Sequence, residues 1–84
     1  MSYDLGDSNK LNEEAKNLDR ARQSLIEELQ AVDWYEERIQ ASSNETLKKI
    51  LIHNRNEEKE HAAMLTEWIK KNDSGFNEAF AKHD

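Results

Sequence analysis

The sequence predicts an all-α protein: an antiparallel hairpin of two long helices, followed by a short third helix. Its 84 residues contain no Pro and only two Gly, and they are rich in Glu, Lys, Leu and Ala, a composition typical of helical proteins. Apolar residues recur at helical spacing through both halves of the chain. Short polar segments able to start or stop helices divide the chain into three parts. The length suits a single domain over residues 1–84.

The first long helix is expected over about residues 9–41, with Ser8 or Asn9 as its N-cap. The segment Ser42–Glu45 (Ser-Ser-Asn-Glu) follows the capping-box pattern and opens a second helix over about residues 44–72. Because the link between these two helices is short, they must pack against each other as an antiparallel hairpin.

A short third helix is expected after a break at Asp73–Gly75, where turn-forming residues end the second helix. It should cover about residues 75–82, with Phe76 and Phe80 on one face because they lie four positions apart.

Composition excludes several classes of function. The chain has no Cys, which excludes a disulfide framework, a thiolate zinc site and thiol redox chemistry. No segment approaches the roughly 20 apolar residues of a membrane span, and the first residues do not form a signal peptide. A net charge of −6 disfavours nucleic acid and anionic membranes as partners and suits a surface that attracts cations.

Both long helices carry polar residues where an apolar seam should continue. On the second helix, alternating steps of four and three give the positions Leu47, Leu51, Asn54, Glu58, His61, Leu65 and Trp68. On the first helix, Glu28 falls inside an apolar stripe formed by Leu25, Leu29, Val32 and Ile39. Carboxylates and an imidazole at a helix interface are costly unless something compensates them, and hard or borderline metal ions do so best.

A single hairpin leaves much of each apolar stripe facing water, and a chain this small usually needs a partner or a metal. We therefore expect two copies to pair into a four-helix bundle. A twofold axis would then bring together four Glu and two His from Glu28, Glu58 and His61, which is the ligand set of a carboxylate-bridged di-iron centre. Glu58 and His61 share a helical face, and Glu28 lies at a similar distance from the turn.

Two other interpretations remain open, because a Glu-x-x-His pair alone is a weak signal. One is a non-catalytic, metal-stabilised assembly module that holds zinc or calcium. The other is a helical interaction hairpin whose buried polar layer sets the pairing register. Six acids are expected to be exposed: Glu27, Asp33, Glu36, Glu37, Glu57 and Glu60. His53 is expected at or near the surface, and His83 in the C-terminal tail.

Three runs of sequence resemble the encapsulated ferritins: Ser24–Leu29, Ala31–Tyr35 and His53–Met64, within a similarity that covers roughly Leu18–Asn72. The resemblance implies a two-helix protomer that pairs to recreate the ferritin-like four-helix bundle. It also implies a decameric ring of five dimers, housed in the cytoplasm inside a nanocompartment built from encapsulin shell protein.

By the same resemblance, Glu28, Glu58 and His61 are the iron ligands of a ferroxidase centre at the dimer interface. That centre oxidises Fe(II) to Fe(III) with dioxygen and supplies iron for storage in the encapsulin nanocompartment. Zinc or calcium can occupy such a centre as mimics of iron.

The resemblance also assigns residues around the centre. Tyr35 lies close to it, in agreement with its position seven residues after Glu28, and Trp34 lines the approach. The family's outer acidic metal site maps to Glu27 and Gln30, where Gln replaces an acid and weakens the attraction for metal. The chain ends at Asp84 without the small, apolar extension by which family members dock on the shell interior.

Overall fold

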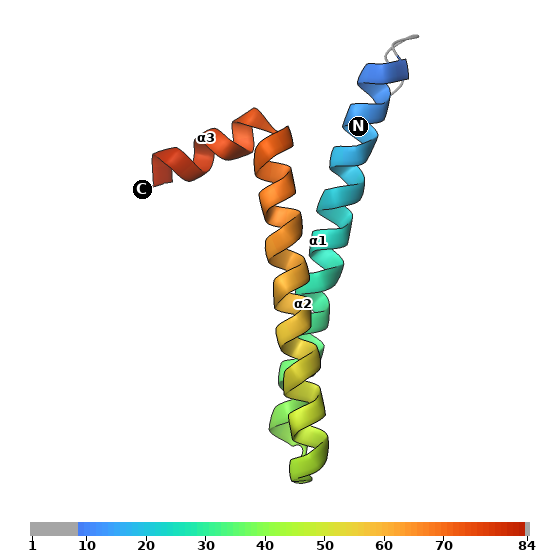
Figure 1. Ribbon diagram of the computed structural model, residues 1–84, viewed down its shortest axis with the longest axis vertical. Coiled ribbons are helices and arrows are strands. Elements are labelled where there is room, and N and C mark those ends of the chain that lie inside the picture. Colours follow the sequence, from blue (N-terminus) through green and yellow to red (C-terminus); the bar gives the residue numbers. More distant parts are fainter. Residues whose placement is uncertain (1–8, 84) are drawn as a thin grey trace.

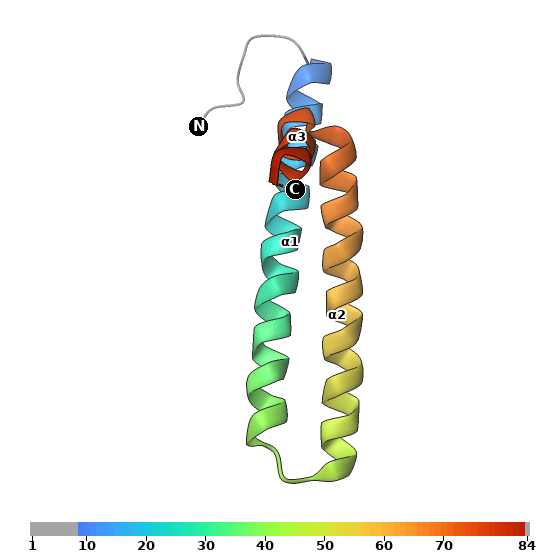
Figure 2. The same ribbon diagram turned by 90° about the vertical axis from the view of Figure 1, so that its left-hand side faces the viewer.

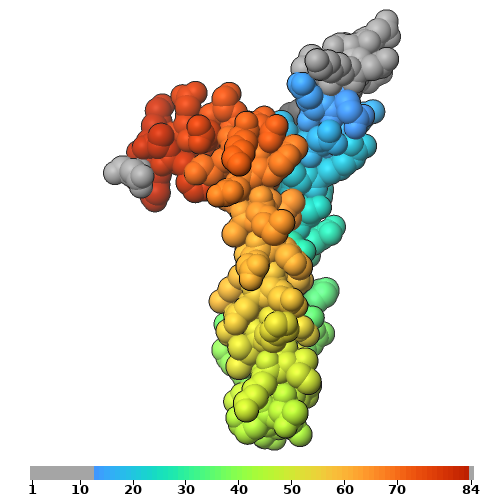
Figure 3. All heavy atoms as spheres, in the orientation of Figure 1, coloured from blue at the N-terminus to red at the C-terminus, as the bar shows by residue number. Residues whose placement is uncertain are grey.

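The computed structural model describes residues 9–83, with side chains described from residue 13 onward, and consists of three helices. Helices α1 (Asn9–Ala41) and α2 (Glu45–Asn72) run antiparallel along each other (Figures 1 and 2). Helix α3 (Ser74–His83) contacts α2 but not α1 within the described residues, and it projects from the hairpin as an arm (Figure 3). The predicted all-α hairpin with a short third helix is therefore confirmed.

The N-terminus of α2 is capped by Asn44, and the segment Ser42–Glu45 does not form a capping box. Asn44 has the extended backbone of an N-cap residue, and its side-chain oxygen accepts a hydrogen bond from the N–H of Leu47 at 2.9 Å. The Ser42 hydroxyl instead accepts the N–H of Asn44 at 3.2 Å, inside the turn. The helix therefore starts after Asn44, so the capping-box prediction is wrong in its cap residue. For α1, the expected N-cap residue Ser8 lies outside the described residues.

Asp73 forms the corner between α2 and α3. Its N–H donates to the carbonyl of Ile69 at 2.8 Å and ends α2, while its Oδ1 accepts the N–H of Phe76 at 3.2 Å and starts α3. Its second carboxylate oxygen lies 3.4 Å from Nη2 of Arg22 on α1. Asp73 therefore sets the bend between α2 and α3, and its carboxylate also links that bend to α1.

The face of α3 that turns toward α2 is aromatic. The rings of Phe76 and Phe80 meet edge to face with centroids 5.1 Å apart, and Lys70 Nζ lies 4.6 Å from the centroid of the Phe80 ring. The two phenylalanines share a face of the helix, as the sequence predicts.

The core of the single chain is thin. Among residues with described side chains, only Ala21, Ala62 and Ile69 are buried. Leu29, expected on the buried stripe, is 55% exposed, because it falls outside the narrow contact stripe between α1 and α2. Eight large apolar side chains are exposed: Ile26, Leu29, Trp34, Leu47, Ile50, Met64, Trp68 and Phe80.

None of the helices in the described part of the chain combines the length and the apolar character that crossing a membrane requires.

Candidate metal centre

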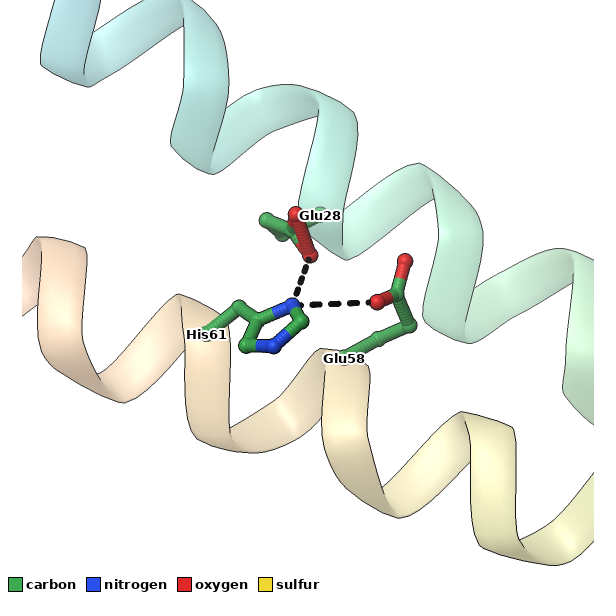
Figure 4. Close-up of side chains that lie close together, drawn as sticks. All are labelled: Glu28, Glu58 and His61. Atoms are coloured by element: carbon green, nitrogen blue, oxygen red, sulfur yellow. Dashed lines mark ion pairs between the residues drawn. The ribbon is translucent and has the colours of Figure 1, made fainter.

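Three potential metal ligands converge between α1 and α2, near the middle of the hairpin. Glu58 and His61 come from successive turns of α2, and Glu28 reaches them from α1 (Figure 4). Nδ1 of His61 lies 3.2 Å from Oε1 of Glu58 and 3.4 Å from Oε2 of Glu28. One ligand atom from each residue can be chosen so that all three lie within 4.8 Å of one another.

The two carboxylates are partly removed from water, whereas the imidazole is half open. The side chains of Glu28 and Glu58 are 23% and 24% exposed, and that of His61 is 53% exposed. Oε2 of Glu28 is buried, and no described residue donates a hydrogen bond to it. A buried carboxylate oxygen without a donor is costly, and a cation would compensate it directly. The donor set therefore fits a bound metal ion.

The chemistry of these ligands selects a class of ion. Two carboxylates and one imidazole suit divalent ions such as iron, manganese or zinc, while a site dominated by thiolates is excluded because the chain has no Cys. Three ligands from one chain leave coordination positions free. The exposed edge of His61 adjoins an apolar depression that it lines together with Met64, Leu65 and Trp68. The site is therefore open on the side of the hairpin where its apolar residues are exposed.

Among the His, Asp and Glu residues that the structure describes, the group able to hold a metal consists of Glu28, Glu58 and His61 alone. The other residues expected around the site differ in their exposure. Glu27 and Gln30 are exposed, as an outer site requires, and Tyr35 is half-buried. Trp34 is 59% exposed, with the guanidinium of Arg38 5.8 Å from its ring centroid. His53 is also exposed and pairs with Glu57 on the outer surface of α2.

One contact beside the site is absent from the sequence-based prediction. Glu36, expected to be an exposed acid, is half-buried, and its Oε1 accepts a hydrogen bond from Nη1 of Arg55 at 2.7 Å. The guanidinium of Arg55 holds the pKa of Glu36 below its ordinary value. The sequence gives one indication of this contact: Arg55 lies three positions before Glu58 on the same helix, near the candidate ligands.

The fold and the site together define a class. A helical hairpin that offers Glu from one helix and Glu-x-x-His from the other provides half of the ligand set of a carboxylate-rich di-metal bundle protein. The comparison with known families gives the particular group. The chain matches the EncFtn-like family over residues 5–83 and belongs to that family.

Individual relatives agree with this assignment. The chain is 54% identical over 68 residues to a protein of Rhodospirillum rubrum named encapsulated ferritin-like protein, a match that covers 81% of this chain and 49% of the relative. It is 55% identical over 60 residues to a Thermotoga maritima ferritin-like protein, covering 71% of this chain and 53% of that one. This chain thus spans about half the length of these relatives.

Two further similarities extend the picture. A protein of Myxococcus xanthus named encapsulin nanocompartment cargo protein EncB is 38% identical over 63 residues, covering 75% of this chain and 40% of that one. The crystal structure of protein ne0167 from Nitrosomonas europaea superimposes with a TM-score of 0.81 at 46% identity, covering 93% of this chain and 86% of that chain. The three-helix arrangement of this chain is thus shared with an experimental structure.

Proposed function

We propose that this chain is a ferroxidase that oxidises Fe(II) to Fe(III) with dioxygen at a di-iron site formed between two copies. The observation that carries this proposal is the convergence of Glu28, Glu58 and His61 across α1 and α2, with a buried oxygen of Glu28 that lacks a hydrogen-bond donor. Membership of the EncFtn-like family supports iron as the metal.

Ferrous iron is the substrate, and the protein's part is to bind and orient it. Glu28 and Glu58 supply hard, anionic oxygen ligands, which bind ferric iron more tightly than ferrous iron and so make loss of an electron easier. His61 adds a neutral ligand without adding negative charge. Four ferrous ions supply the four electrons that reduce one dioxygen to two waters, with uptake of four protons.

Pairing of two copies follows from what one chain leaves incomplete. Each hairpin supplies two Glu and one His, whereas a di-iron site built on a four-helix bundle uses four Glu and two His. The exposed side chains of Leu47, Ile50, Met64 and Trp68 lie on α2, the helix that carries Glu58 and His61. A second copy packed over this side would cover these apolar groups and complete the site in one step.

Assembly and cellular context extend the proposal. We propose that the dimers form a decameric ring, as the resemblance to the encapsulated ferritins implies. We also propose that this ring works inside an encapsulin shell, because one relative is named a cargo protein of such a compartment. An open ring would not itself enclose a mineral core, so the ferric product would be stored in the shell.

The test is an aerobic assay of iron oxidation, followed at near-ultraviolet wavelengths where ferric species absorb. The wild-type protein should oxidise ferrous iron faster than the spontaneous reaction in buffer. Glu58→Ala should lower the rate to the spontaneous level, since it removes one carboxylate per chain and two per paired site. His53→Ala is the matched control, because His53 is an exposed residue on the same helix, outside the ligand cluster.

Mass measurements on the same samples separate the alternatives. Ferrous iron or zinc should shift the wild-type protein toward the paired state, because metal bound only there stabilises it. Metal binding with pairing but no accelerated oxidation would identify a structural metal module. A folded monomer whose mass does not change with metal would contradict the proposed site between two copies.

A further inference from the structure

The apolar side chains in the part of the hairpin between the metal centre and the turn are only half-buried. Within the fully described stretch from residue 29 to residue 57, Ile39 and Leu51 are examples, and no side chain reaches the burial of Ala21, Ala62 and Ile69. Those three residues lie on the other side of the cluster or directly beside it. A polar contact can therefore add to the apolar packing that sets the distance between α1 and α2 on this side of the cluster.

A polar link joins α1 and α2 in this stretch. Arg55 on α2 donates from Nη1 to Oε1 of Glu36 on α1 at 2.7 Å. Its Nε and Nη2 also donate to Oδ1 of Asn56, at 3.2 and 3.1 Å. The Arg55 side chain is only 22% exposed, so the guanidinium is ordered by three hydrogen bonds in a partly dry environment.

On both helices the link lies on the turn side of the ligands, close to Glu58 on α2 and farther from Glu28 on α1. Arg55 precedes Glu58 by three residues, which is less than one helical turn, and Glu36 follows Glu28 by eight, which is a little over two turns. Three close polar contacts between described residues join segments on opposite sides of the hairpin: His61 with Glu28, Arg55 with Glu36, and Arg22 with Asp73. The Arg55–Glu36 pair is the one between the ligands and the turn.

We infer that Arg55 and Glu36 are positioning residues, which hold α1 and α2 at the separation and rotation that keep Glu28 opposite Glu58 and His61. The inference rests on the proposed function and deepens it, because it names what prepares the metal site. Without the link, metal binding would itself have to order this half of the hairpin, and part of the binding free energy would be lost.

In the experiment, cobalt(II) is the probe metal and is titrated into the whole 84-residue chain. Cobalt(II) reports its coordination by its visible absorption, and it needs no oxidation chemistry. Arg55→Met keeps an unbranched apolar stem but removes the donors, and Glu36→Gln removes the charge of the partner. Arg22→Met is the matched control, since it breaks an ion pair between α1 and the Asp73 corner at the far end of the hairpin.

We expect Arg55→Met to weaken cobalt binding about tenfold and to change the visible spectrum. Glu36→Gln should act in the same direction, and the double variant should be little worse than Arg55→Met alone, because both changes break one contact. Arg22→Met should leave affinity and spectrum close to those of the wild type. Rescue by Arg55→Lys should be partial, because lysine keeps the charge but not the planar set of donors.

Two results would overturn the inference while leaving the proposed function intact. One is wild-type cobalt affinity and spectrum in Arg55→Met, even if that variant melts at a lower temperature. The other is an equal loss of affinity in Arg22→Met, which would indicate a general effect of hairpin stability. Absence of cobalt binding to the wild-type protein would overturn the inference together with the metal site itself.

Discussion

The two halves of the hairpin are held together by different physical means. The turn-distal half, which includes Ala21 on α1 and Ala62 and Ile69 on α2, contains every buried residue among the described side chains. The apolar side chains of the turn-proximal half, residues 29–57, are at most half-buried, and the Asn44 cap and the Arg55–Glu36 link add to their packing.

The group of Glu28, Glu58 and His61 lies at the boundary between these halves. His61 is adjacent to the buried Ala62, while Glu58 lies less than one turn from Arg55. A buried apolar contact resists separation of the helices, whereas a polar link fixes direction and distance. The cluster is thus flanked by buried apolar packing on one side and by a charged hydrogen bond on the other.

The largest stability effect should come from the turn-distal half. Ile69 is 2% exposed, so Ile69→Ala should lower the free energy of unfolding of the metal-free protein by about 2–4 kcal/mol through lost burial and a cavity. Leu51→Ala, at a half-buried position of the turn-proximal half, should cost clearly less. Urea unfolding at one fixed protein concentration gives both values. Equal losses would show that the two halves are packed alike.

A smaller effect, in the turn-proximal half, should depend on pH. The Arg55 hydrogen bond depresses the pKa of Glu36 in the folded protein below the ordinary 4.5, so the stabilisation is fully present above that value. It is lost as pH falls through the depressed pKa. Wild type should therefore melt at a higher temperature than Glu36→Gln near neutral pH, and the difference should shrink in acid.

Thermal melts of wild type and Glu36→Gln between neutral and strongly acidic pH would measure the difference in melting temperature. The other carboxylates are the same in both proteins, so their titration cancels in that difference. Arg55→Met serves as the control background, in which Glu36→Gln should have little effect at any pH. A difference between wild type and Glu36→Gln that does not change with pH would contradict the ion-pair explanation and indicate a packing effect of position 36.

Substitution of Gln30 should have the smallest effect on stability but a selective effect on metal occupancy. Gln30 and Glu27 are exposed and three positions apart on α1, next to the ligand Glu28 in sequence. Gln30→Glu adds one acid per chain, so it should raise occupancy of an outer metal position more than occupancy at the inner ligands. The free energy of unfolding should change by less than about 0.5 kcal/mol, as for most surface substitutions.

Anomalous scattering from metal-soaked crystals of wild type and Gln30→Glu would compare the two positions directly. Added salt should reduce the gain at the outer position, because attraction between exposed charges is screened. Equal outer occupancy in the two proteins would show that this pair of residues does not steer metal.

The sequence by itself determined the three helices, their approximate ends and the hairpin. These depend on local rules: the absence of Pro, the apolar period, and the turn-forming segment at residues 73–75. Glu58 and His61 were also placed on one face by sequence alone, because residues three apart on a helix cannot diverge. Their approach to Glu28 could be predicted because a short turn fixes the register of the two helices.

Only the tertiary structure decided what depends on rotation of a helix about its axis and on the reach of long side chains. Leu29 fits the apolar period, yet it is exposed because the contact stripe between the helices is narrow. Arg55 pairs with Glu36, and Asp73 both caps α3 and meets Arg22, because flexible side chains span distances that spacing along the chain does not encode. Local periodicity thus fixes which helices form and which residues share a face, whereas packing between helices fixes which partners those residues find.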